Sequence, residues 1–182
     1  DIPANLADDF RALTRTADDF TTTANQTRIA VDTSREVAST GRVAVDLSRS
    51  LGEKSTAFTT GLDDLAAKAG RSQPQSAANI SQRVESIKEI TRAISQGSDD
   101  AALRTQLQTQ LKQLGDDIPA NLADDFRALT RTADDFTTTA NQTRIAVDTS
   151  REVASTGRVA VDLSRSLGEK SSTLTTGLDD LA

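Results

Sequence analysis

The sequence predicts an all-α fold, a tandem helical repeat of 116 residues in which a long amphipathic helix precedes two short helices. Apolar residues recur at spacings of three and four, which is typical of elongated bundles with coiled-coil-like packing. Residues 1–66 also recur as residues 117–182 at a constant offset of 116, and such self-similarity is the signature of repeat architectures. The two copies differ only at Thr56/Ser172, Ala57/Thr173 and Phe58/Leu174.

We therefore divide the chain into residues 1–116, a complete unit, and residues 117–182, the long-helix part of a second unit. The chain starts without Met and stops in mid-period, so we expect it to be a piece of a longer array. Its apolar content is 36% and relies on Ala, with five Phe and no Trp, Tyr or Met. Such a chain fits thin bundles, in which each helix buries one stripe, better than a thick globular core.

The long helix is expected over about residues 3–68. None of the three prolines falls within residues 4–68, and Pro3 and Pro119 each stand where a helix would begin. Gly41, Gly52 and Gly61 each cost up to about 1 kcal/mol relative to Ala in a helix. The sequence favours a continuous helix and leaves open a kink at one of these glycines.

Two overlapping seams mark the buried face of this helix. The first starts at Leu6 and alternates steps of four and three as far as Val45, and the second repeats every seven residues from Ala30 to Leu65. Because the second replaces the first along the chain, we predict an apolar face that rotates, with different partners at its two ends. The predicted packing seam comprises Leu6, Phe10, Leu13, Phe20, Val31, Val37, Val45, Leu51, Phe58, Leu62 and Leu65.

Residues 67–116 read as a two-helix connector. Gly70 is predicted to end the long helix just before Pro74, and helices are expected over about residues 77–96 and 99–114. Gly97 and Gly115 are the predicted stops of these helices, and the Pro119 junction leaves open whether the chain extends or reverses there. The predicted connector core comprises Ile80, Val84, Ile87, Ile90, Thr91, Ile94, Leu103, Leu107, Leu111 and Leu114.

Charge is unevenly distributed, although the net charge is only −6. Each 66-residue segment carries 11 acidic residues against 7 basic ones, whereas residues 67–116 carry 5 against 7. A nucleic-acid-binding protein needs a concentrated positive face, so this balance argues against that class. The connector and the long helices are instead expected to attract each other.

Arginines spaced by seven form a ridge on the long helix at Arg28, Arg35, Arg42 and Arg49. One interpretation is a strip for an anionic partner such as phosphate, anionic lipid or an acidic protein. The other is a solvated flank that pairs with Asp32 and Asp46 four residues along the helix. The acidic balance and the absence of interleaved aromatic residues favour the flank.

The residue types needed for most catalysis are scarce. The chain has no His, Cys or Tyr, and it lacks the nucleophile-elbow, phosphate-loop and dinucleotide-binding spacings, so we expect no enzyme and no cofactor. Acidic doublets such as Asp8-Asp9 lie on helices, where neighbouring side chains diverge, so we expect no metal site. No apolar run approaches the roughly 20 residues that span a bilayer.

The helix order resembles that of spectrin-type three-helix arrays and of helical repeat regions in large bacterial surface proteins. The near-identity of the copies predicts a non-catalytic spacer whose partners are neighbouring repeats, because one packing solution is reused. The absence of Cys is compatible with a bacterial surface or secreted location as well as a cytosolic one. An alternative is a binding module whose long helices dock a partner helix or self-associate. A second alternative is a partly disordered stress-type protein, which predicts low helicity.

Overall fold

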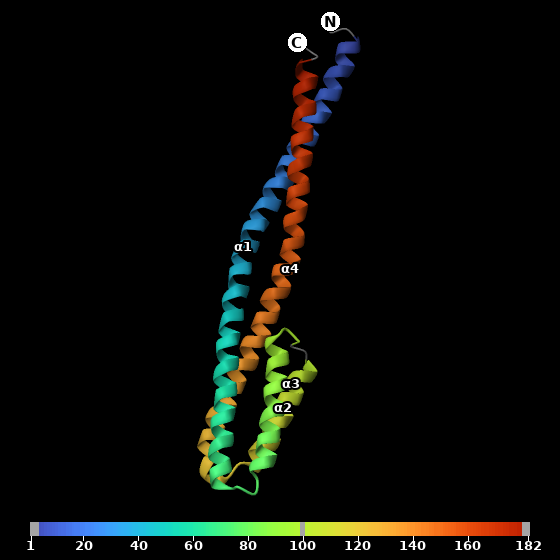
Figure 1. The fold of residues 1–182 in the computed structure, drawn as a ribbon. Coiled ribbons are helices and arrows are strands. Elements are labelled where there is room, and N and C mark those ends of the chain that lie inside the picture. Colours follow the sequence, from blue (N-terminus) through green and yellow to red (C-terminus); the bar gives the residue numbers. More distant parts are fainter. Residues whose placement is uncertain (1–3, 99–100, 180–182) are drawn as a thin grey trace. The chain divides into compact units, whose positions relative to one another are not determined.

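The computed structural model describes residues 4–98 and 101–179, with side chains from residue 7 onwards, and is almost entirely helical. No strand occurs in this described part of the chain, so the predicted all-α class is confirmed. The elements in chain order, labelled in Figure 1, are α1 (Ala4–Ser72), α2 (Ala77–Ser95), α3 (Ala101–Asp117), the 3-10 turn η1 (Ala120–Leu122) and α4 (Ala123–Asp179).

The chain divides into two units, and both long helices contribute to each. Unit 1 comprises Asp1–Gly41 with Thr149–Ala182, which are the first part of α1 and the last part of α4. Unit 2 comprises Arg42–Asp148 and contains the rest of both long helices together with α2, η1 and α3. Each unit is described by itself below.

Helix α1 continues through every glycine within it, including Gly70, which was wrongly predicted to end it. The amide of Gln73 still donates to the carbonyl of Ala69 at 2.8 Å, and Ala69 is fully buried in unit 2. The helix ends at Ser72 because Pro74 disfavours helical backbone at the residue before it. The expected continuous long helix is therefore present and reaches four residues beyond its predicted end.

The end of α2 follows the prediction at Gly97. This glycine has φ of +93°, the left-handed region that side chains other than hydrogen rarely occupy. The amide of Ser98 donates to the carbonyl of Ala93 at 3.0 Å and that of Gly97 to Ile94 at 3.1 Å, which together form a Schellman cap. The predicted acidic start of the next helix, Asp99-Asp100, lies outside the described residues.

Helix α3 does not stop at residue 114 as predicted but runs through Gly115 to Asp117. A Cβ added at Gly115 would lie 2.6 Å from Cε1 of Phe126, so the glycine allows the α4 ring to approach the α3 backbone. The helix then ends at Ile118-Pro119, where proline removes an amide donor and restricts the preceding residue. Gly115 is thus a packing residue rather than a stop.

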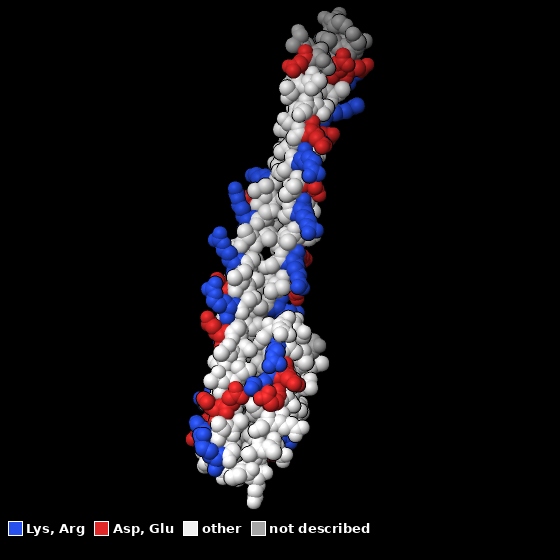
Figure 2. All heavy atoms as spheres, in the orientation of Figure 1, with Lys and Arg blue, Asp and Glu red and all other residues white. Residues whose placement is uncertain are grey.

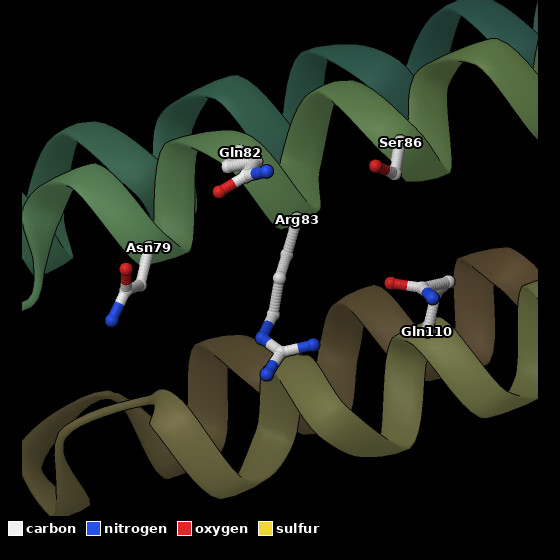
Figure 3. Close-up of a pocket in the computed structure, with 5 residues that line it drawn as sticks. All are labelled: Asn79, Gln82, Arg83, Ser86 and Gln110. Carbon is white, nitrogen blue, oxygen red and sulfur yellow. The ribbon is translucent and has the colours of Figure 1, made fainter.

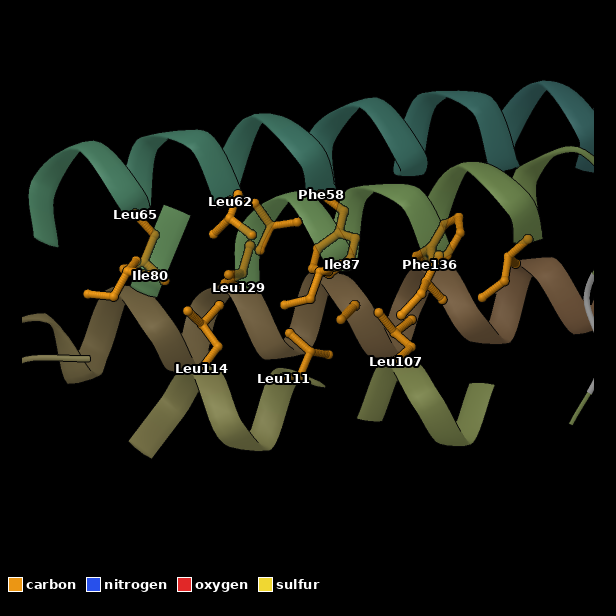
Figure 4. Close-up of a cluster of buried hydrophobic side chains, with 14 of the residues drawn as sticks. Phe58, Leu62, Leu65, Ile80, Ile87, Leu107, Leu111, Leu114, Leu129 and Phe136 are labelled. Carbon is orange, nitrogen blue, oxygen red and sulfur yellow. The ribbon is translucent and has the colours of Figure 1, made fainter. Parts of the chain in front are cut away.

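The core of unit 2 is formed by all four helices (Figure 4). Helix α1 contributes Phe58, Leu62 and Leu65, whose side chains point toward α2, α3 and α4. The rings of Phe58 and Phe136 stack with centroids 6.0 Å apart and planes inclined by 21°. Except for Leu103, which is half-buried, the connector residues predicted for the core are buried: Ile80, Val84, Ile87, Ile90, Thr91, Ile94, Leu107, Leu111 and Leu114.

The connector reverses the chain. Within unit 2, Lys68 pairs with Asp125 at 2.8 Å, and Lys54 lies 4.0 Å from Asp135. Partner numbers in α4 therefore rise as those in α1 fall, so these two helix segments are antiparallel. Of the two junction geometries left open by the sequence, the structure has the reversal.

Candidate functional site: a self-complementary helix face

Unit 1 consists of two antiparallel helix segments that contact each other through small and polar residues. Lys170 donates a hydrogen bond to the hydroxyl of Thr23 at 3.1 Å. A Cβ added at Gly177 would lie 3.1 Å from Cδ1 of Leu13, and one added at Gly157 would lie 3.8 Å from Oγ of Ser34. Gly177 therefore allows Leu13 to approach closely, whereas the distance at Gly157 is an ordinary van der Waals contact.

The contact between a glycine and a leucine occurs again in unit 2 with the helices exchanged. There a Cβ added at Gly61 of α1 would lie 2.9 Å from Cδ1 of Leu129 in α4. Gly177 is the copy of Gly61, and Leu129 is the copy of Leu13. One sequence therefore supplies both sides of the same contact, which is the property of an isologous interface between identical partners.

Several positions of the long segment are buried in both copies. Thr23 and its copy Thr139 are each 4% exposed, and Ala30 with Ala146 and Ala44 with Ala160 are also buried. On α1 these covered positions fall on two rows with steps of seven, one from Leu13 to Gly41 and one from Thr23 to Leu65, as in a heptad seam. Together with Gly61, whose copy Gly177 contacts Leu13, we call these the pairing face: Leu13, Phe20, Thr23, Thr27, Ala30, Ser34, Val37, Gly41, Ala44, Leu51, Phe58 and Leu65.

The pairing face corrects the predicted seam. Phe10, Val31 and Val45 lie outside it and are exposed, by 60% in the case of Val45. The pairing face combines one heptad row of the first predicted seam with the heptad row of the second. Because these two rows lie side by side along α1, the buried face does not rotate as predicted. Leu13, Phe20 and Val37 are half-buried, Leu51, Phe58, Leu62 and Leu65 are buried, and Leu6 lies outside the described side chains.

The hydroxyls on the pairing face are satisfied within their own helices. Thr23 donates to the carbonyl of Asp19 and Thr27 to that of Thr23, both at 2.8 Å. In α4, Thr139 and Thr143 donate to the carbonyls four residues earlier. These threonines can therefore be buried against an apolar or small-residue partner without losing their hydrogen bonds, whereas the buried hydroxyl of Ser150, the copy of Ser34, has no partner.

The predicted arginine ridge lies in solvent. Arg28, Arg35, Arg42 and Arg49 are exposed, and Lys and Arg along both long helices have Asp and Glu among them (Figure 2). Asp32 pairs with Arg35 at 3.3 Å and Asp46 lies 3.9 Å from Arg49, so both use the arginine three residues later rather than the expected one four residues earlier. In α4 the four-residue pairing does occur, between Arg144 and Asp148 at 3.4 Å.

A polar depression of about 300 Å³ lies between α2 and α3 (Figure 3). It is lined by Asn79, Gln82, Arg83, Ser86 and Gln110, and Arg83 reaches from α2 toward α3. The Arg83 guanidinium donates to Gln113 at 2.7 Å and to the carboxylate of Asp117. These bonds tie α2 to the end of α3 and give the arginine a structural role.

Lys88 joins α2 to α1 by an ion pair that no sequence pattern indicated. Its ammonium donates to Asp63 and to Glu85, each at 3.0 Å. The hydrogen bond to Asp63 and then that to Glu85 raise the pKa of Lys88 above its ordinary value of 10.5, whereas burial alone would lower it. The charged form is therefore favoured by folding.

We expect Lys88→Gln to lower the free energy of unfolding by about 1 kcal/mol or less at neutral pH. Because folding raises this pKa, the stabilisation is fully present below pH 10.5 and is lost as the pH rises through the folded-state value. Urea unfolding of both proteins at pH 7, 9 and 11.5 checks this. Asp32→Asn, which removes an exposed pair within α1, is the control, and a Lys88→Gln deficit that persists unchanged at pH 11.5 would contradict it.

Residues with metal-ligating side chains do not gather in the described part of the chain: no three His, Cys, Asp or Glu residues there are placed to hold an ion. Among the described residues, no helix has a stretch both long and apolar enough to cross a bilayer. No protein-family model, curated protein or solved structure matches this chain.

Proposed function

We propose that this chain is a non-catalytic structural repeat whose long segments pair with each other to build a spacer in a larger repetitive protein. The partners are then neighbouring repeats of the same chain. The observation that carries this proposal is the contact between Gly61 and Leu129, which recurs between Gly177 and Leu13 with the helices exchanged. A sequence that matches its own copy needs no second protein to cover its pairing face.

The near-identity of the two copies supports the same proposal. On a self-complementary face, the same change made in both copies alters both of the exchanged contacts. The three differences between the copies fall at positions 56–58 and their counterparts, and of these only Phe58 belongs to the pairing face. In an array with nearest-neighbour contacts, such conservation between copies reuses one packing solution.

Chains carrying two, four and six long segments would test the spacer. Contour length, measured by electron microscopy of single particles, is expected to grow by a fixed increment for every added pair of segments. Pairs are the relevant step because the connector reverses the chain. A length that does not grow, or grows irregularly, would rule out the spacer.

A second candidate function is a binding module for a partner helix, and exposed β-branched residues favour it. Ile29 and Val31 in unit 1, and Val43 and Val45 in unit 2, flank the pairing face and are exposed. Sedimentation equilibrium of the chain and of a Val43→Ser/Val45→Ser variant tests self-association through these residues. A concentration-dependent dimer that the variant loses would support it, whereas a fully helical monomer at micromolar concentration would argue against it.

A further inference from the structure

One row of apolar side chains is buried in one copy of the long segment and open in the other. Phe10 on α1 is 63% exposed, whereas its copy Phe126 on α4 is half-buried and packs against the core of unit 2. The two alanines that follow at spacings of seven are half-buried in α1 and fully buried in α4. We call these the docking rows: Phe10, Ala17 and Ala24 on α1, and Phe126, Ala133 and Ala140 on α4.

The other long helix in each unit, α1 in unit 2 and α4 in unit 1, shows the same difference in burial. Leu62 on α1 is fully buried in unit 2, whereas its copy Leu178 on α4 is 52% exposed in unit 1. Phe58 is likewise fully buried, and its counterpart Leu174 is half-buried. Both helices of unit 1 therefore expose apolar positions that are closed in unit 2.

The connector accounts for the difference. Both units contain the same antiparallel pair of helix faces, and unit 2 additionally contains α2 and α3. The ring of Phe126 lies against the backbone of α3 at Gly115, so this helix covers the docking row of α4 directly. Ile80, Ile87 and Leu107 complete the cover as fully buried residues of the common core.

We propose that the open face of unit 1 is a docking site for a second connector hairpin with the sequence of residues 67–116, entering where α4 ends. In unit 2 the hairpin leaves the end of α1 and covers the start of α4. In unit 1 the end of α4 occupies the position that the end of α1 has in unit 2, and the start of α1 occupies the position of the start of α4. A hairpin continuing from α4 would therefore place the counterpart of Gly115 over Phe10.

A hairpin from another copy of this chain is a poorer occupant. The apolar side chains of α2 and α3 are already buried in their own unit 2, and docking elsewhere would require them to leave it. The proposal rests on the proposed repeat function, because only a repeated chain supplies an uncommitted hairpin. Docking and spacing are nevertheless tested separately. Amide exchange in α1 tests docking, and the contour lengths of chains with two, four and six long segments test spacing.

The test adds residues 67–116 of this chain after Ala182 and measures amide hydrogen exchange over residues 10–20. A matched control adds residues 67–76 only, which prolongs α4 without supplying the hairpin. We expect exchange over residues 10–20 to slow by about tenfold or more with the full extension and little with the control. Equal exchange in the two extended chains would overturn the proposal.

Phe10→Ser provides the second arm, because this exposed residue can be replaced without opening the described core. The substitution is expected to leave exchange in the original chain nearly unchanged and to remove most of the protection gained by the full extension. An equal effect in both backgrounds would overturn the proposal. So would sedimentation showing that the original chain already dimerises through Phe10, since the occupant would then be a second copy.

Discussion

Phe136→Ala is expected to lower the free energy of unfolding by about 3–5 kcal/mol, the usual loss when a buried Phe is truncated. Phe136 is fully buried and stacks on Phe58, an arrangement that adds to the area it buries. Guanidinium unfolding followed by circular dichroism measures the loss. Phe136→Leu, which retains most of the apolar volume, should be considerably milder and keeps the test informative if the alanine variant does not fold.

The matched control for this prediction is Phe20→Ala, because Phe20 is the copy of Phe136 in an identical local sequence. Phe20 is half-buried, and the counterpart of Phe58 in the second copy is Leu174. Its truncation is expected to cost roughly 1 kcal/mol, in proportion to the smaller area it removes from water. Similar losses for the two variants would show that the connector does not set the burial of this position.

Gly61→Leu should destabilise the chain, and Leu129→Ala should partly rescue it. The added side chain must occupy space where even a Cβ would come within 2.9 Å of Leu129, and such overpacking typically costs about 1–3 kcal/mol. Leu129→Ala alone leaves a cavity and is expected to lower the free energy of unfolding by about 2–5 kcal/mol. Because the double variant refills that cavity, its loss is expected to be smaller than the sum of the single losses.

Urea denaturation of the four proteins in this double-mutant cycle measures the coupling, which we expect to be about 1–3 kcal/mol in favour of the double variant. Gly52→Leu is the control, since nothing lies within 4 Å of a Cβ added there. That change should be neutral or stabilising, because Leu is a better helix former than Gly. Additive losses at Gly61 and Leu129 would mean that the two residues do not meet in solution.

The sequence was informative where burial depends on a short periodic pattern. The Ile and Val residues of α2 and the Leu residues of α3 recur on one face of short helices, and that face is the buried one. The sequence was ambiguous at glycine, because glycine residues have different structural roles at different positions. Gly97 adopts a left-handed conformation, whereas Gly115 sits in regular helix and makes room for Phe126. Backbone conformation identifies the use at Gly97, and the packed residue Phe126 identifies that at Gly115.

The burial of the long segments could not be read from local sequence at all. Phe10 and Phe126 have identical neighbours over many residues, yet one is mostly exposed and the other is covered. The difference arises from α3, which is remote in sequence from the first copy. Gly61 was likewise treated as a helix-weakening residue, although repeat positions 13 and 61 recognise each other in both units.

Because the connector reverses the chain, it matters whether a chain has an even or an odd number of long segments. Under the proposed pairing, each long segment uses its face for one partner, so segments within one chain pair two at a time. A chain with an odd number of segments would then retain one unpaired face, and a second such chain would carry the complementary surface. Gain or loss of one repeat by recombination between near-identical copies would then convert a self-contained chain into one that joins another end to end or side by side.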